Sequence, residues 1–119
     1  MTITIGSKRI GEGKPVFIIA EISCNHLQKK DLALKMIGEA KVAGADAVKF
    51  QTYTPDTITL DVDNEHFRIK GTLWNGRTLH DLYKEAYTPW DWFPELQDRA
   101  KKEGLEFFSS PFDETAVDF

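Results

Sequence analysis

The fold is decided by the stretch Gly44-Ala45-Asp46-Ala47-Val48-Lys49-Phe50-Gln51, in which a helix stop is followed at once by a strand. Glycine ends helices readily because it accepts a left-handed backbone. The preceding residues 30–43 carry small and apolar side chains at helical spacing, which predicts an amphipathic helix. An apolar strand is predicted before it, over residues 16–22. Two apolar strands joined by a helix and a short return indicate a right-handed βαβ unit with parallel strands.

The alternation of strand and helix continues toward the C-terminus. A short helix is predicted over residues 78–86. The next helix is expected to restart near Pro94, because a proline deeper in a helix removes a hydrogen bond, and to run to Lys102. A third strand is predicted over residues 106–110, and Pro111 opens a further helix. The order βαβαβ indicates an α/β fold.

Two segments are predicted to form hairpins. Residues 2–5 and 8–10 indicate a small N-terminal β-hairpin. Residues 52–77 are long for a connection inside a compact domain, which is typical of a functional loop. Residues 58–62 and 67–69 alternate in polarity within it, and we expect a loose hairpin there.

Polar side chains stand at the carboxyl ends of the predicted strands. Lys49 and Gln51 share one face of their strand, whereas Val48 and Phe50 share the other, because side chains alternate along a strand. The apolar pair suits packing against helices, so the polar pair faces the opposite side, which is the interior in a (β/α) barrel. Glu21 ends the first strand with the same parity. Polar groups at this end of barrel strands build active sites.

Each of these side chains has more than one interpretation. Burying an ammonium costs free energy unless it is paired or binds an anion, so Lys49 can hold a phosphate or carboxylate, form a Schiff base, or pair with Glu21. Glu21 can act as a general base, bind a hydroxyl, or serve only in that ion pair. Gln51 can bind a polyol or be a satisfied strand-end amide. Ser109 and Ser110 can donate to an anion or simply end their strand.

The remaining candidate groups point less clearly to chemistry. His26 can bind a metal or an anion, but the three histidines show no metal-ligand spacing. His66 and His80 are expected to be solvated. Cys24 is expected to be a packed residue rather than a nucleophile, since no histidine–acid pair is evident. The segment Trp74-Asn75-Gly76-Arg77 is the part of the long loop that can touch a ligand.

Composition narrows the function classes. The 119 residues are 41% hydrophobic and 29% charged, which is typical of one globular domain. A formal charge of -4 gives no general reason to bind nucleic acid or an anionic membrane, and no run approaches a membrane span. A single cysteine precludes an internal disulfide, and no signal-peptide core is evident. We therefore expect a cytoplasmic protein with no nucleic-acid or membrane partner.

The strand segments together resemble the sialic acid synthase family, which includes the N-acetylneuraminate synthases. The resemblance lies in residues 17–26 (FIIAEISCNH), 43–52 (AGADAVKFQT) and 108–113 (FSSPFD). Within the family, residues 71–83 (GTLWNGRTLHDLY) and 88–92 (TPWDW) resemble pseudaminic acid synthases. The cysteine-containing loop after the first strand departs from the Asn-His-Asn-Gly pattern of N-acetylneuraminate synthases.

The resemblance implies a carbon–carbon bond-forming transferase. Such enzymes condense phosphoenolpyruvate with the open-chain aldehyde of a six-carbon amino sugar, giving a nine-carbon sugar acid and phosphate for cell-surface glycan biosynthesis. For pseudaminic acid synthases the sugar is 2,4-diacetamido-2,4,6-trideoxy-altrose. N-acetylneuraminate or legionaminate synthesis, a Schiff-base aldolase using Lys49, and an inactive chain that only assembles are the alternatives.

The resemblance also implies roles for five residues of this chain. Lys49 and Ser110 would bind phosphoenolpyruvate, and Glu21, Gln51 and Asn75 would contact the sugar. Glu21 and Lys49 are the implied catalytic residues. The implied divalent ion, Mn or Mg, polarises the aldehyde. Its histidine ligands lie on later strands of the family's barrel, outside this chain.

The family fold is a (β/α)8 TIM barrel followed by a small antifreeze-like domain. A barrel needs about 250 residues. Residues 1–119 are therefore expected to be the N-terminal portion of the synthase domain, with about three βα units after the hairpin and without the rest of the barrel. We expect this portion alone to be inactive, and the full-length enzyme to be a homodimer.

Overall fold

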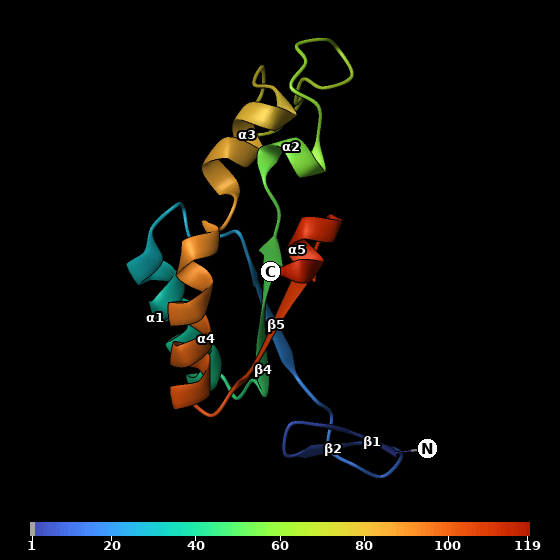
Figure 1. Cartoon of the computed structure of the whole chain (residues 1–119), viewed down its shortest axis with the longest axis vertical. Helices are drawn as coiled ribbons and strands as arrows, with labels where there is room; N and C mark the ends of the chain where they lie inside the picture. Colours follow the sequence, from blue (N-terminus) through green and yellow to red (C-terminus); the bar gives the residue numbers. More distant parts are fainter. Residues whose placement is uncertain (1) are drawn as a thin grey trace.

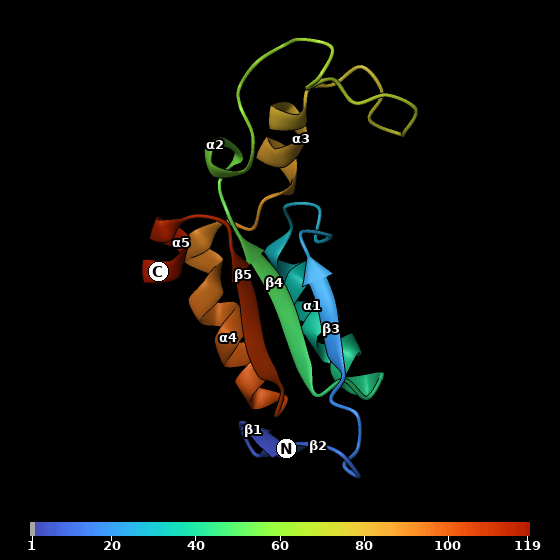
Figure 2. The ribbon, with the colours of Figure 1, turned by 90° about the vertical axis from the view of Figure 1, so that its right-hand side faces the viewer.

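A three-stranded parallel sheet organises the computed structural model, which describes residues 2–119. Its strands are β3 (Ile19–Ser23), β4 (Ala47–Thr52) and β5 (Glu106–Pro111), in the order β3-β4-β5. Two helices, α1 (Lys30–Val42) and α4 (Phe93–Lys102), lie side by side against one face of the sheet (Figure 2). The predicted α/β class and parallel pairing are confirmed.

The core lies between these two helices and the sheet. Val48 and Phe50 of β4 are fully buried, as are Ile37 of α1 and Leu96 of α4. The rings of Phe50 and Phe107 stack at a centroid distance of 5.5 Å, which joins β4 to β5 on the helix side. This apolar layer fixes which face of each strand turns away from the helices.

The return from α1 to β4 forms as predicted from its glycine and aspartate. Gly44 adopts φ 88°, a left-handed conformation that residues with a Cβ rarely adopt. The Asp46 carboxylate accepts from the backbone N–H of Ile18 at 2.9 Å and pairs with Lys8 at 3.1 Å. The backbone hydrogen bond and the carboxylate's charge partner hold the pKa of Asp46 below its usual range. One short turn thereby fixes where β3 begins to pair with β4.

The N-terminal hairpin is confirmed as β1 (Thr2–Ile5) and β2 (Lys8–Gly11), paired antiparallel. It lies at the amino ends of the sheet strands, away from the end that carries the candidate site (Figure 1). Lys8 in this hairpin is the partner of Asp46. The hairpin is therefore tied to the turn that sets the β3–β4 register.

The first sheet strand begins later than predicted. Val16 is 80% exposed and precedes β3, which starts at Ile19. The Ile18 carbonyl accepts from the backbone N–H groups of Asp46 and Ala47, so the chain meets β4 only at the turn. The apolar run at residues 16–18 belongs to the approach to the sheet rather than to its ladder.

The hairpin predicted within residues 52–77 is wrong. Residues Pro55–Ile58 form a short helix, α2. Between α2 and α3 (Leu79–Ala86), the strand pairing in the described residues is limited to an isolated bridge between Arg68 and Thr78. Proline presets the first position of a helix, and Thr54 with Thr57 caps its start. Capping therefore explains the helix at residues 55–58, whereas residues 59–62 and 67–69 alternate in polarity without forming the predicted strands.

The remaining helices follow the expected boundaries closely. Helix α3 spans Leu79–Ala86 and is capped by Thr78. A short 3-10 helix, η1 (Trp90–Trp92), precedes α4, whose first turn contains Pro94 as predicted. Helix α5 (Glu114–Asp118) is capped by the Asp113 side chain. Helices α2 and α3 and their connection stand beyond the carboxyl ends of the sheet strands (Figure 1).

Truncating a core side chain of α1 should lower the free energy of unfolding far more than truncating an exposed side chain of the same helix. Ile37→Ala removes a fully buried side chain from α1, and we expect the free energy of unfolding to fall by about 2–5 kcal/mol. Val42→Ala, at an 83% exposed position of the same helix, should change it by less than about 0.5 kcal/mol. Urea denaturation followed by circular dichroism measures both. Equal losses would contradict the core described above.

Candidate active site

Four of the five predicted site residues lie on the sheet face opposite the helices. Lys49 pairs in register with Glu21 of β3, and Gln51 pairs with Ser110 of β5. Residues in register on parallel strands share a face. The four side chains therefore lie on one face, in two rows near the carboxyl ends of three adjacent strands. The parity predicted from β4 agrees with the burial of Val48 and Phe50 on the other face.

Lys49 and Glu21 form an ion pair. The distance from Lys49 Nζ to Glu21 Oε2 is 2.7 Å, and the two side chains are 37% and 43% exposed. The expectation of a buried ammonium is therefore wrong, because no helix of residues 2–119 covers this face of the sheet (Figure 2). An ion pair this accessible to water contributes at most about 1 kcal/mol to stability. Its geometry matches one of the three interpretations of Lys49 and leaves the other two as predictions.

Gln51 is positioned by an irregularity in β3. The β3–β4 register shifts between Glu21 and Ser23, and Ser23 adopts φ 56°. The Ser23 hydroxyl then donates to Gln51 Oε1 at 2.8 Å. That contact uses the amide oxygen of Gln51 and leaves its amide nitrogen as a donor for another group.

The two serines of β5 face opposite sides of the sheet. The Ser109 hydroxyl is 2.5 Å from Thr52 Oγ1, on the side of Phe50. Ser110 stands across from Gln51, on the side of Lys49. Of the two serines, only Ser110 shares the face of the candidate site.

Asn75 does not join the group on the sheet. Its side-chain oxygen accepts from the Gly71 backbone N–H at 3.0 Å within the long connection, where Asn75 is exposed. Its neighbour Trp74 instead lines a cavity of about 320 Å³ that reaches back to Gln51. The contact of Asn75 with the sugar stays a prediction, and within the same segment it is Trp74 that lines the cavity beside Gln51.

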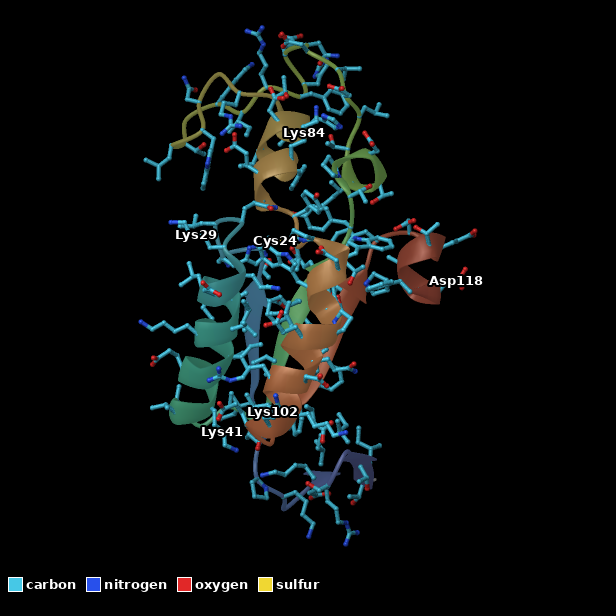
Figure 3. The ribbon with its side chains drawn as sticks, turned by 60° about the vertical axis from the view of Figure 1, so that its left-hand side comes forward. Cys24, Lys29, Lys41, Lys84, Lys102 and Asp118 are labelled. Carbon is cyan, nitrogen blue, oxygen red and sulfur yellow. The ribbon has the colours of Figure 1, made fainter. Side chains whose placement is uncertain are left out.

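The loop after β3 supplies the floor of this cavity. Cys24 lies where the carboxyl ends of the strands meet the segment that carries α3 (Figure 3). Burial raises the pKa of the Cys24 thiol, with weaker opposing hydrogen bonds from Tyr53 and Thr88. A protonated thiol is a poor nucleophile, which supports the predicted packing role.

His26 is a packing residue in this structure. Its ring is fully buried, Nε2 lies 2.9 Å from Thr88 Oγ1, and the ring meets Trp92 edge to face at 5.3 Å. Burial lowers the pKa of His26, so the neutral ring is favoured. Through these contacts His26 joins the β3–α1 loop to the segment before α4.

The prediction that His80 is solvated is wrong, whereas His66 is exposed as expected. The His80 ring is 2% exposed; Nε2 lies 2.8 Å from Asp56 Oδ1, and Nδ1 lies 3.3 Å from Asp61 Oδ1 without the alignment of a hydrogen bond. The ring therefore connects α3 to α2 and to the segment after it. The sequence signal for this contact is the pair of acidic residues, Asp56 within α2 and Asp61 after it.

Within residues 2–119, no group of three or more His, Cys, Asp or Glu side chains is arranged to hold a metal ion. In the same range, no helix combines the length and the apolar character needed to cross a bilayer.

The profile of the NeuB family matches residues 36–119, which include β4, β5 and most of the candidate site. This chain belongs to the NeuB family. The pseudaminic acid synthases of Campylobacter jejuni and Helicobacter pylori are 53% and 45% identical to it over 89% and 88% of this chain. A crystal structure of the N-acetylneuraminic acid synthetase of Leptospira borgpetersenii, in complex with citrate, superposes with a TM-score of 0.80 at 35% identity.

Almost all of this chain aligns with these proteins, but only a part of each of them is covered. The chain spans about 31% of the length of each of the two pseudaminic acid synthases. It is covered over 99% of its own length by the Leptospira structure but accounts for 36% of that protein. The elements described above therefore correspond to about a third of these relatives.

Replacing His26 should make the free energy of unfolding less sensitive to acid. The folded-state pKa is lowered below the unfolded value near 6.5, so on acidification the unfolded chain takes up a proton first, and stability falls. Above about pH 7.5 both states are neutral and the ring contributes no pH dependence. Between pH 7.5 and 5.5 we expect wild type to lose about 1 kcal/mol more unfolding free energy than His26→Gln.

Urea titrations at the two pH values measure this difference. The matched control is His66→Gln, because His66 is an exposed histidine outside the buried core. An identical slope for wild type and His26→Gln would show that the buried ring does not resist protonation.

Proposed function

We propose that this chain forms part of a phosphoenolpyruvate-dependent sugar-acid synthase of the pseudaminic acid type. The observation that carries the proposal is the placement of Glu21, Lys49, Gln51 and Ser110 on one sheet face at the carboxyl ends of three parallel strands. The substrate class is supported by 53% identity to a pseudaminic acid synthase, against 35% to an N-acetylneuraminic acid synthetase. Phosphoenolpyruvate and 2,4-diacetamido-2,4,6-trideoxy-altrose are the proposed substrates.

In the proposed reaction, carbon 3 of phosphoenolpyruvate attacks the sugar aldehyde, water adds at carbon 2, and phosphate leaves by cleavage of the C–O bond. Lys49 would supply a cation for the anionic groups of phosphoenolpyruvate, and the Ser110 hydroxyl a donor beside it. The anion would compete with Glu21 for Lys49, which is feasible because an exposed ion pair is weak. Glu21 and Gln51 would then be available to order the aldehyde or the attacking water.

The barrel is also part of the proposal. We infer that β3, β4 and β5 are the first three strands of a (β/α)8 barrel, and that activity requires the other strands. The open sheet face, with Lys49 at its centre, supports this inference, because a barrel would enclose that face. Cytoplasmic location, where phosphoenolpyruvate is made, and a homodimeric state complete the proposal.

The residues present do not fit the divalent ion that the resemblance implies. Glu21 is paired with Lys49, and residues 2–119 contain no set of three candidate ligands in ligating geometry. No step of the proposed reaction is therefore assigned to a metal held by this chain.

The test uses a polypeptide extended to the length of the relatives. We expect phosphate release with phosphoenolpyruvate and the diacetamido sugar, and a loss of about 100-fold or more in Lys49→Met, because an oriented charge that stabilises the reacting anion is removed. Lys41→Met, at the exposed end of α1, is the matched control and should retain activity.

Three results would count against this function. Phosphate release with N-acetylmannosamine but not with the diacetamido sugar would overturn the substrate assignment. Full activity of Lys49→Met would overturn the site. Borohydride trapping of pyruvate on Lys49 would replace the synthase by an aldolase.

A further inference from the structure

We propose that the cavity between Gln51 and Trp74 binds the second acetamido group of the sugar, the one that N-acetylmannosamine lacks. This inference rests on the proposed function and adds to it the residues that select the sugar. The cavity has a volume of about 320 Å³, at the lower limit for ligand pockets, which suits part of a sugar rather than a whole cofactor.

The lining of the cavity matches the two halves of an acetamido group. Trp74, Leu82 and Tyr83 offer apolar and aromatic surface for the methyl group. Gln51 and Asn25 offer polar atoms for the planar amide. Asn25 Nδ2 already donates to the Ile22 carbonyl at 3.1 Å, so its oxygen is left to accept the N–H, while the Gln51 nitrogen can donate to the acetyl oxygen.

The charge of the cavity excludes an anionic ligand. None of its lining residues is a lysine, arginine or histidine. The single carboxylate among them, Glu85, is held by Arg77 through two contacts of 2.8 and 2.9 Å. Phosphate and carboxylate groups would therefore be unpaired here, whereas a neutral amide would not.

The outer wall of the cavity is held in place by contacts within its own segment. The Trp74 backbone N–H donates to Thr72 Oγ1 at 3.2 Å, and the Trp74 carbonyl accepts from the Arg77 N–H at 3.1 Å. Arg77 in turn binds Glu85 on α3. Trp74 is nevertheless 45% exposed, which leaves surface that a ligand can cover.

The same residues carry the sequence signal for the subgroup. Trp74, Leu82 and Tyr83 fall within residues 71–83, the segment that resembles pseudaminic acid synthases rather than the wider family. The loop that contributes Cys24 and Asn25 departs from the N-acetylneuraminate synthase pattern. Both distinguishing segments therefore meet in one cavity beside Gln51.

The experiment compares Trp74→Ala with Leu73→Ala in the extended polypeptide. Leu73 is 96% exposed and does not line the cavity, so it is the matched control. For Trp74→Ala we expect kcat/KM to fall about 10- to 100-fold with the diacetamido sugar, mainly through KM, and less than about 3-fold with N-acetylmannosamine. Leu73→Ala should match wild type with both sugars. Equal losses with both sugars, or no loss with either, would overturn the inference.

A binding measurement separates this inference from the proposed function. Saturation-transfer NMR, with the diacetamido sugar and without phosphoenolpyruvate, should show transfer to an acetyl methyl group in wild type and Leu73→Ala but not in Trp74→Ala. Transfer without any turnover would contradict the synthase and retain the cavity. Turnover with no difference in transfer between the two variants would retain the synthase and contradict the cavity.

Discussion

The alternation of side chains along β4 is the constraint on which the candidate site depends. Val48 and Phe50 are buried beneath α1 and α4, and this forces Lys49 and Gln51 onto the opposite face. A slip of one residue would expose a phenylalanine worth about 2 kcal/mol of burial and would drive an ammonium into the apolar layer. Both penalties oppose the slip, so the packing of the core also fixes the direction of the polar groups.

The two faces of the sheet differ in their access to water. On the helix side, aromatic rings stack and exclude water. On the other side, Lys49 and Glu21 form a pair that remains more than a third exposed. Enclosing this face would strengthen the attraction between the two charges but would also impose a desolvation cost on both. In the proposed site an anionic substrate would offset that cost for Lys49, as the Glu21 carboxylate does in this structure.

The spacing of apolar residues predicted the helix and strand that bury one face. It did not predict the segments whose structure depends on capping side chains or on tertiary contacts. The helix ended by Gly44 and the parity of Lys49 follow from apolar spacing, and the structure bears them out. A proline and two capping threonines account for the helix at Pro55–Ile58, and the alternating residues after it form no strand ladder. The buried His80 ring meets Asp56 and Asp61 only through the tertiary fold, and no pattern of its own helix reveals this contact.

Lys49 and Gln51 divide the proposed site into a charged part and a neutral part. Two residues along a parallel strand span about 6.6 Å, which sets the separation between an anion at Lys49 and an amide group beyond Gln51. The ion pair lies on the open sheet, whereas the cavity beyond Gln51 has no basic residue in its lining. In the proposed site, phosphoenolpyruvate would therefore lie at Lys49 and the acetamido group of the sugar beyond Gln51, because the reverse placement would leave the anion without a cation. The order of these two side chains on one strand would thus set the order of the two proposed substrates along it.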